Sequence, residues 1–262
     1  DAEELVTRLR GSVQVAASNN AELPGIADFA AREAELAAEV GAVGNNLIVE
    51  RDTILENLRA VQNRNGLELS ERLADEELGF DIEMETGTGK TYVYLRTIFE
   101  LAQKYNFTKF VILVPSVAIR EGVITSIELM HDHFRDLYPA LPFDTSVYSG
   151  KSAEEVQSFA TATNVQILVM TIDSIRGDAN SRIIHQTRDK LQGLRPIDYL
   201  KATRPVVIMD EPQNMESKLS QTAIDELSPT CTLRYSATHR KTRNVVYRLD
   251  PVDAHDKGLV KQ

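Results

Sequence analysis

This sequence of 262 residues lacks tryptophan and has only one cysteine, Cys231. A single thiol can form neither a disulfide within the chain nor a cysteine-based zinc site, so both are excluded. Cys231 lies in an apolar, alternating run, and we interpret it as a packed core thiol. The lack of disulfides fits a reducing compartment, and we expect a bacterial cytoplasmic protein.

Long apolar runs are also missing. No stretch approaches the roughly 18–20 apolar residues that a helix needs to cross a bilayer, so we expect no membrane partner. The first residues, DAEELVTRLR, lack the basic and apolar stretches of a signal peptide, and there is no initiator Met. We therefore expect a fragment or a processed chain of a globular protein, with ordinary fractions of hydrophobic (42%) and charged (26%) residues.

The sequence also lacks an excess of positive charge. The formal net charge is −10, which argues against a nucleic-acid partner. The acid is concentrated in residues 1–79, which carry 16 Asp and Glu against 7 Lys and Arg, whereas residues 81–262 are almost balanced. Residues 234–249 contain five basic residues and no acidic one. This strip is either a basic surface for a polyanion or a solvated segment, and the sequence leaves both open.

The pattern of apolar residues changes near residue 80. Residues 1–78 show helical spacing at 26–40 and 47–61 and no catalytic motif, so we predict a helical N-terminal segment. From residue 79 onward, short apolar runs alternate with helical ones, which predicts an α/β fold with a doubly wound, mostly parallel sheet. The predicted strands are 80–84, 110–114, 145–148, 166–170, 206–209 and 232–235, and the first predicted helix of this region is 90–105.

The strongest motif is ETGTGKT at residues 85–91, between the first predicted strand and that helix; we call it the phosphate loop. Gly87 and Gly89 allow the backbone to turn and to bring its N–H groups to phosphate oxygens, at a helix N-terminus that favours negative charge. Lys90 can reach the β- and γ-phosphates, and Thr91 can offer its hydroxyl to Mg²⁺. Met84 stands where the longest form of the motif has its first glycine. We predict a site for ATP and Mg²⁺ formed by Thr86, Gly87, Thr88, Gly89, Lys90 and Thr91.

Two carboxylates follow the apolar strand predicted at 206–209. At the edge of a parallel sheet, Asp210 would lie beside the phosphate loop and hold the hydration shell of Mg²⁺. Glu211 would then orient or deprotonate the water that attacks the γ-phosphate. Paired acids also end strands as plain surface residues, and the upstream phosphate loop favours the catalytic interpretation.

Together these residues resemble superfamily 2 helicases, in which a RecA-like domain carries the phosphate loop and an acidic box. The box here is Asp-Glu-Pro-Gln at 210–213. With EMETGTGKTYVYLRTI at 83–98, VPSVAIREG at 114–122 and YRLDPVDAHDKGLVKQ at 247–262, it is similar to the Res subunit of type III restriction enzymes. The resemblance implies that residues 79–240 are the first RecA-like motor domain and that residues 241–262 are a basic segment leading to a second one.

The resemblance also implies function and partners. Such a subunit uses ATP to move or switch state on double-stranded DNA, and it carries a second RecA-like domain and a nuclease domain in the same chain. It cleaves DNA in complex with a Mod methyltransferase. We find neither the motifs of the second motor domain, including its arginine finger, nor a nuclease motif. We therefore expect this chain alone to bind ATP weakly and to hydrolyse it poorly.

Further residues take roles only through the resemblance. Gln213 would link the acidic box to the γ-phosphate, although an amide that caps the turn is the alternative. In the Ser-Ala-Thr of motif III, Ser236 and Thr238 would hydrogen-bond to the box and couple turnover to movement. The DNA backbone would be contacted from motifs Ia and Ib, unless these are ordinary strand-to-helix loops. The residues expected to make these contacts are Ser116, Arg120 and Thr171.

Two other interpretations remain at this stage. The first is a DNA repair or phage helicase of the same superfamily, against which the Asp-Glu-Pro-Gln box argues. The second is a P-loop regulatory module that never touches DNA, which the acidic charge favours and the Ser-Ala-Thr element disfavours. Gln62 is a weak candidate for an adenine-binding glutamine.

Overall fold

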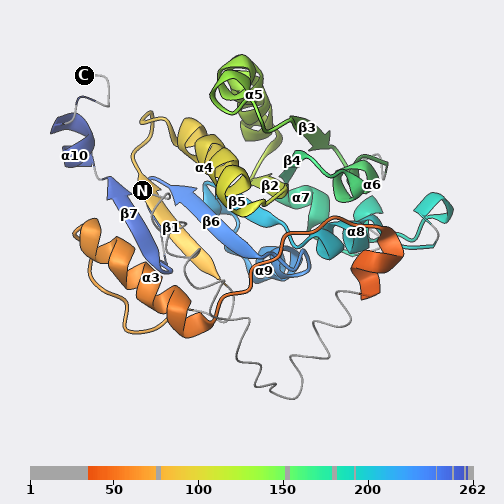
Figure 1. The fold of residues 1–262 in the computed structure, drawn as a ribbon, viewed down its shortest axis with the longest axis horizontal. Helices are drawn as coiled ribbons and strands as arrows, with labels where there is room; N and C mark the ends of the chain where they lie inside the picture. Colours follow the sequence, from red (N-terminus) through yellow and green to blue (C-terminus); the bar gives the residue numbers. More distant parts are fainter. Residues whose placement is uncertain are drawn as a thin grey trace.

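The computed structural model describes residues 35–74, 78–150, 154–178, 182–191, 193–239, 241–249, 251–256 and 258. Its centre is a seven-stranded sheet with the order β3-β4-β2-β5-β6-β1-β7, in which all neighbours are parallel (Figure 1). The strands are β1 (Gly79–Met84), β2 (Lys109–Val114), β3 (Phe143–Tyr148), β4 (Val165–Thr171), β5 (Val206–Asp210), β6 (Cys231–Ser236) and β7 (Val245–Leu249). The predicted α/β fold with a doubly wound parallel sheet is confirmed.

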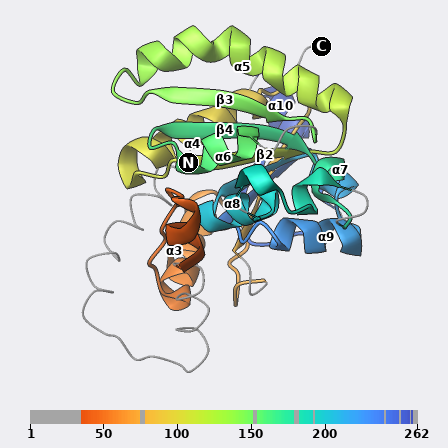
Figure 2. The same ribbon diagram turned by 90° about the vertical axis from the view of Figure 1, so that its right-hand side faces the viewer.

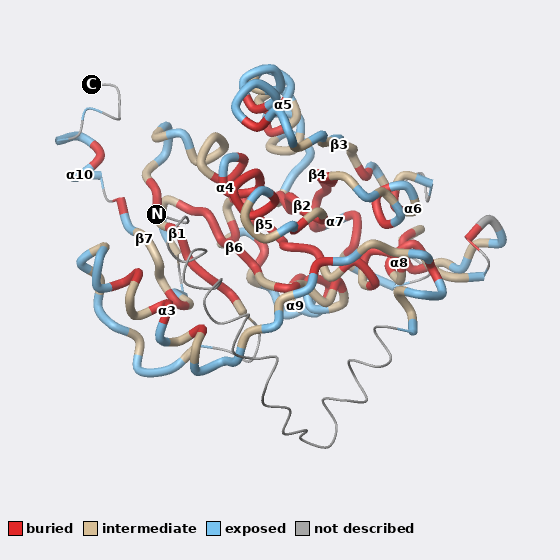
Figure 3. The backbone as a smooth tube through the Cα atoms, in the orientation of Figure 1, coloured by how far each residue is buried: buried red, intermediate tan, exposed pale blue. Residues whose placement is uncertain are grey.

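Helices cover both faces of the sheet (Figure 2). One face packs against α3 (Arg51–Arg64), α4 (Lys90–Tyr105) and α5 (Val117–Leu137). The other packs against α6 (Glu154–Thr161), α7 (Ile172–Ile175), α8 (Pro196–Thr203) and α9 (Lys218–Asp225), and α10 (Pro251–Asp256) follows the last strand. Every residue of β2, β4 and β5 is buried, which explains why their sequences are apolar on both sides (Figure 3). None of the described helices is long and apolar enough to span a bilayer.

The helical segment before the sheet is part of the same packed core. Ile54 and Leu58 of α3 are buried in the cluster that contains the apolar residues of α4 and the sheet. At the amino end of β2, the Asn45 side chain donates to the carbonyl of Lys109 at 2.7 Å and accepts from the backbone N–H of Thr108 at 2.9 Å. Helix α3 agrees with the predicted stretch at 47–61, whereas most of the stretch at 26–40 lies outside the described residues.

Gln62 does not read adenine in this structure. It is 2% exposed and donates to the carbonyl of Val245, at the amino end of β7, at 3.0 Å. Its side-chain oxygen accepts from the backbone N–H of Ser70 at 2.8 Å. The phosphate loop follows the carboxyl end of β1, and β1 and β7 are parallel, so Gln62 lies at the opposite edge of the sheet. It holds the loop after α3, and the sequence-based suggestion is wrong.

Strand β7 is the element that the sequence did not predict. It pairs with β1, so the sheet continues past residue 240, where we expected the motor domain to end. As an edge strand it is only partly buried, and its sequence VVYRL lacks the continuous apolar run that marks β2 and β5. Its neighbours in the chain are basic and polar, which is why the whole stretch had the composition of a surface segment.

Candidate functional site

The candidate residues gather at one edge of the sheet. All seven strands are parallel, so their carboxyl ends lie at the same edge. The phosphate loop follows β1 and the acidic box follows β5, and β6 lies between these strands and pairs with both. The register sets Ser236 opposite Glu83 and Tyr235 opposite Asp210. The phosphate loop, the acidic box and the Ser-Ala-Thr element therefore lie at nearly the same level of the sheet.

The phosphate loop has the backbone conformation that its glycines allow. Gly87 has a φ of 80° and Gly89, the N-cap of α4, has a φ of 89°, a region that L side chains rarely adopt. No atom lies within 4 Å of a Cβ built on either glycine, so the space beside the loop is open. The loop is closed on itself by Thr88, whose hydroxyl donates to the carbonyl of Glu85 at 2.6 Å. A helix N-terminus and an open loop together suit a phosphate group.

Lys90 joins the phosphate loop to the acidic box. Its ammonium nitrogen lies 3.1 Å from Oε1 of Glu211 and 3.4 Å from the carbonyl oxygen of Met84. The lysine side chain is only 11% exposed and that of Glu211 is 25% exposed. The ammonium group of Lys90 thus lies between the phosphate loop and the acidic box, a position from which it can bind a phosphate group.

Asp210 is a buried carboxylate at the end of β5, 7% exposed. The pKa of this carboxyl is raised to about 6, because burial and the neighbouring Glu211 raise it more than Lys90 lowers it. The phenol of Tyr94 is close to both Asp210 and the Thr91 hydroxyl: burial and then Asp210 raise the pKa of Tyr94, and Thr91 lowers it. Asp210 and Thr91 therefore lie on the same side of the sheet, within reach of one phenol.

Glu211 differs from Asp210 in its environment. Its backbone is left-handed, with a φ of 57°, and its N–H donates to the carbonyl of Tyr235 at 3.0 Å. Burial acts to raise the pKa of Glu211, but hydrogen bonds from Gln213 and Lys90 outweigh it, and the pKa is lowered. Glu211 is thus held as a carboxylate beside a lysine, where it can accept a proton or orient a water molecule.

The acidic box contacts the Ser-Ala-Thr element directly. Gln213 donates to Oε2 of Glu211 at 2.5 Å, and Ser236 Oγ lies 2.8 Å from Oε1 of Gln213 and 3.5 Å from Oε2 of Glu211. Ser236 also lies 2.7 Å from the carbonyl oxygen of Thr238, whose N–H points back at it. A hydroxyl has one proton, so Ser236 donates to one of these acceptors at a time. The predicted contact of Ser236 with the box is present, whereas Thr238 takes part through its backbone.

The three predicted DNA contacts lie in different environments. Ser116 is exposed and caps α5, its hydroxyl accepting from the N–H of Ile119. The side chain of Arg120 is 15% exposed and is paired with the exposed Glu121 at 2.8 Å. Thr171 is only 6% exposed, at the end of the inner strand β4, so it offers little surface to a DNA backbone. This position disfavours the predicted contact.

The basic strip of residues 234–249 is only partly internal. Arg234 is 4% exposed, and its guanidinium lies 3.1 Å from the buried carboxylate of Asp81. Arg248 forms an ion pair with Glu83 but is exposed, as is Lys241. Arg234 therefore belongs to neither of the two interpretations left open, whereas both remain open for the exposed residues.

Sequence reasoning missed Tyr94. This residue lies one helical turn after Lys90 and is fully buried in the core cluster. Its helical spacing marks it as a core residue, and that signal is correct but incomplete, because the phenol also lies near Asp210 and Thr91, with its oxygen buried and without a hydrogen-bond partner.

The described residues include no group of three or more His, Cys, Asp and Glu side chains that could hold a metal ion by themselves. Mg²⁺ is commonly bound by one or two protein oxygens together with the phosphates of a nucleotide. The buried carboxylate of Asp210 and the hydroxyl of Thr91, both beside the phenol of Tyr94, are oxygen ligands of the kind that such a site uses.

Comparisons with known proteins identify relatives of this sequence. The family described as "Type III restriction enzyme, res subunit" matches residues 55–241. The Res subunit of the type III restriction-modification enzyme EcoP15I from Escherichia coli is 34% identical over 226 residues, 78% of this chain and 23% of that protein. The EcoPI Res subunit of Escherichia phage P1 is 32% identical over 229 residues, 79% of this chain and 23% of that protein. The chain thus spans about a quarter of the length of these relatives.

Among solved structures, a nuclease-deletion mutant of the type ISP restriction-modification enzyme LlaGI, in complex with a DNA substrate mimic, is similar over 78% of this chain and 20% of that one. The TM-score is 0.48 and the sequence identity is 13%.

Proposed function

Because the chain belongs to the Res-subunit family of type III restriction enzymes, we propose that it is an ATP-dependent DNA motor domain of such a subunit, the first of two. It would bind ATP and Mg²⁺ at the edge formed by β1, β6 and β5 and use hydrolysis to move or switch state on double-stranded DNA. The observation that carries the proposal is the 3.1 Å contact of Lys90 with Glu211, which joins the phosphate loop to the acidic box.

ATP binding would depend on the loop and the start of α4. The backbone N–H groups of residues 86–89 and the helix N-terminus would hold the phosphates, and Lys90 would turn from Glu211 toward the β- and γ-phosphate oxygens. Asp210 and Thr91 would hold Mg²⁺, which supplies positive charge to the phosphate oxygens as the bond to the γ-phosphate breaks. Negative charge on Asp210 is disfavoured by burial, so a cation there would be favoured.

Hydrolysis would depend on Glu211. Once Lys90 has moved to the phosphates, the carboxylate of Glu211 is free to accept a proton from the attacking water, with Gln213 fixing one of its oxygens at 2.5 Å. Proton transfer of this kind contributes about 10²–10⁴-fold to a rate. Gln213 would act as a positioning residue for Glu211, and not as a cap of its own turn.

Coupling to movement would start at Ser236. This hydroxyl can donate either to Gln213 of the acidic box or to the carbonyl of Thr238, so a change at the box can change which of the two accepts its hydrogen bond. The segment after Thr238 leads to β7 and then toward the proposed second motor domain. DNA contacts are proposed for Ser116 and Arg120, at the end of the same sheet.

Partners and boundaries follow the family. We propose that the complete protein carries a second RecA-like domain with an arginine finger and a nuclease domain, and that it works with a Mod methyltransferase in the bacterial cytoplasm. Residues 1–78 would be a helical addition to the motor domain, and the motor domain would extend from residue 79 through β7. Without the second domain this chain would hydrolyse ATP poorly, since an arginine finger contributes about 10³–10⁵-fold.

The test is DNA-stimulated ATPase activity of the full-length protein with its methyltransferase partner. We expect double-stranded DNA to raise the turnover of ATP, and a Ser236→Ala variant to retain ATP binding while losing most of the stimulation. A DNA-independent ATPase, or ATP binding without turnover, would favour the regulatory module instead. Strand separation without any cleavage partner would favour a repair or phage helicase.

A further inference from the structure

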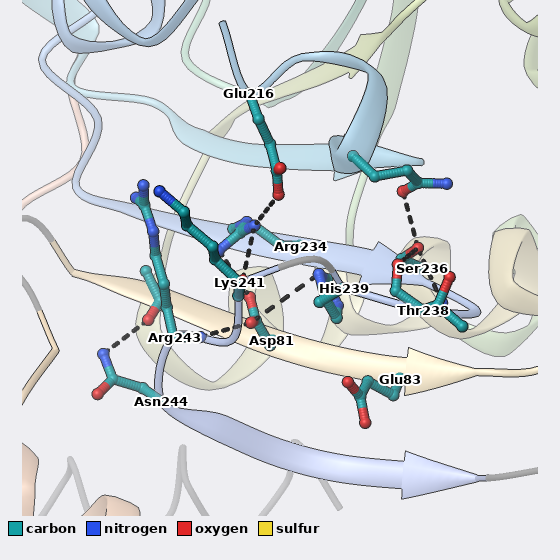
Figure 4. A network of polar contacts seen from close by, with 12 residues as sticks. Asp81, Glu83, Glu216, Arg234, Ser236, Thr238, His239, Lys241, Arg243 and Asn244 are labelled. Atoms are coloured by element: carbon teal, nitrogen blue, oxygen red, sulfur yellow. Dashed lines mark hydrogen bonds and ion pairs between the residues drawn. The ribbon is translucent and has the colours of Figure 1, made fainter. Parts of the chain in front are cut away.

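A buried polar cluster lies on the face of β1 and β6 that points away from α4 (Figure 4). Asp81 of β1 is 0% exposed and Arg234 of β6 is 4% exposed, and the two residues are partners in the strand register. Their nearest atoms, Oδ1 of Asp81 and NH1 of Arg234, are 3.1 Å apart. Their neighbours in the strands, such as Ile82 and Tyr235, face the apolar core on the other side.

The chain between β6 and β7 is held by this cluster. After Ser236, residues 237–239 and 241–244 return across the sheet face; we call this segment the crossover (Figure 4). Oδ2 of Asp81 accepts from the N–H of Arg243 at 2.6 Å, and the N–H of Asp81 donates to the carbonyl of Arg243 at 3.1 Å. The guanidinium of Arg234 lies 3.5 Å from the carbonyl oxygen of Lys241.

The same guanidinium reaches the segment that follows the acidic box. NH2 of Arg234 lies 3.4 Å from Oε1 of Glu216, a residue just beyond the turn Pro212–Asn214. Arg234 therefore contacts three segments at once: β1, the end of the acidic-box turn and the crossover. Few side chains other than arginine present several N–H groups in one rigid plane to such a set of acceptors.

A second connection links these two segments two residues further along β6. Ser236 lies on the same face as Arg234 and contacts Gln213 of the acidic box and the backbone of Thr238 in the crossover. The Ser236 contact is short and uses one proton, whereas the buried Arg234 contacts two carboxylates and one backbone carbonyl. Arg234 and Ser236 both connect the acidic-box segment with the crossover. The buried contacts of Arg234 therefore limit how far the contacts of Ser236 can shift.

Burying these charges is unfavourable, which indicates that the cluster serves geometry more than stability. Burial raises the pKa of Asp81 to about 6, with Arg234 and the N–H of Arg243 opposing that rise. Apolar residues of similar volume commonly stabilise a core as well as a buried ion pair does. In some proteins, however, a buried ion pair fixes one arrangement of the segments that it joins, and Arg234 has contacts with three segments here.

We propose that Arg234 is a positioning residue for ATP turnover, holding the acidic-box turn and the crossover in one register through Glu216 and the Lys241 carbonyl. The inference rests on the proposed function, because it assigns Arg234 to the same ATP site. Arg234 does not touch the nucleotide site itself; it acts through Gln213 and Ser236.

The experiment is steady-state ATPase kinetics of the full-length protein with DNA. Arg234→Lys keeps the charge but loses the planar set of donors, and we expect kcat to fall about 10-fold, as for the loss of a hydrogen bond to a charged group, with KM for ATP within about 2-fold. Glu216→Gln removes one partner at a partly exposed site, and we expect kcat to fall about 3-fold, again at constant KM.

Arg248→Gln is the matched control. Arg248 is also a strand arginine paired with a β1 carboxylate, that of Glu83, but its side chain is 48% exposed and the pair does not involve the crossover. We expect its kcat and KM to stay within about 1.5-fold of the wild type, since exposed ion pairs contribute little. Nucleotide binding, measured in parallel, gives the fraction of folded sites in each variant.

The outcomes separate the two proposals. A wild-type protein without DNA-stimulated ATPase activity overturns the proposed function. A wild type that turns over ATP, together with Arg234→Lys and Glu216→Gln variants that match Arg248→Gln, overturns the role of Arg234. A change confined to KM also overturns it. If Arg234→Lys does not fold, Glu216→Gln decides alone.

Discussion

Two buried aspartates, Asp81 and Asp210, lie on strands that are separated only by β6, and burial raises the pKa of each to about 6. Their partners differ. Asp81 is enclosed by Arg234 and by the N–H of Arg243, so the protein itself supplies the compensating charge and hydrogen bond. Asp210 lies at the open edge beside the phosphate loop, and Lys90 offsets its burial only in part.

The difference shows how a functional carboxylate can be told from a structural one. Equal burial and an equal rise in pKa do not separate the two residues. The two residues differ in the source of the groups that compensate the carboxylate charge. The chain supplies these groups to Asp81, whereas a ligand would supply them to Asp210. We expect Arg234 and the N–H of Arg243 to offset the burial of Asp81 in part, whereas the burial of Asp210 destabilises the nucleotide-free protein until a cation binds.

The largest effect is expected at the open edge. Glu211→Gln removes the carboxylate that would accept the proton and leaves the phosphate loop intact, so ATP turnover should fall about 10³-fold while nucleotide affinity changes little. Turnover is measured in the full-length protein with DNA, with Glu128→Gln, at an exposed position of α5, as the control. Continued hydrolysis at the wild-type rate would show that another group activates the water.

The next effect concerns the enclosed aspartate. Arg234→Met leaves the carboxylate of Asp81 buried without its guanidinium partner, and the free energy of unfolding should fall by about 3 kcal/mol at pH 7.5. Chemical denaturation measures this change, and Arg135→Met, at an exposed position of α5, is the control. A neutral or stabilising result would mean that Arg234 does not compensate Asp81.

The smallest effect has the opposite sign. The folded-state pKa of Asp210 is raised from 3.8 to about 6, so the folded protein binds more protons than the unfolded chain between these values, and stability falls as pH rises through this window. Asp210→Asn removes this penalty and should raise the free energy of unfolding of the nucleotide-free protein by about 1–3 kcal/mol at pH 7.5.

The same reasoning fixes the pH dependence of that gain. It should shrink as pH falls from about 6 toward 4, because the wild-type carboxyl then becomes neutral. Denaturation at several pH values measures it. Destabilisation by Asp210→Asn at pH 7.5 would make Asp210 a structural residue like Asp81 and remove the contrast between them.

Much of the fold and the centre of the site could be predicted from the sequence, because local patterns determine them. Continuous apolar runs mark strands that are buried on both faces, such as β2 and β5. The glycines at 87 and 89 and the paired acids at 210 and 211 are each contiguous and follow a strand, so their convergence follows from a parallel sheet alone.

The remainder depends on contacts between distant segments, which local patterns do not contain. The basic composition of residues 234–249 concealed β7, because an edge strand needs little apolar sequence and because Arg234 is paired inside the protein with Asp81. Thr171 follows a strand as a DNA-contacting residue should, but the chain around it buries the hydroxyl. Tyr94 has the spacing of a core residue, and only the fold brings its phenol to Asp210.

The most direct test of the nucleotide site is equilibrium binding of a fluorescent ATP analogue, with Mg²⁺, to the full-length protein and to its Lys90→Ala and Lys104→Ala variants. Both lysines lie on α4, but only Lys90 joins the phosphate loop to Glu211, whereas Lys104 pairs with Glu100 one turn from the helix end. The account predicts that Lys90→Ala lowers affinity by about 100-fold or more, equivalent to about 2.8 kcal/mol, and that Lys104→Ala binds like the wild type. Equal affinity of the wild type and Lys90→Ala would contradict it.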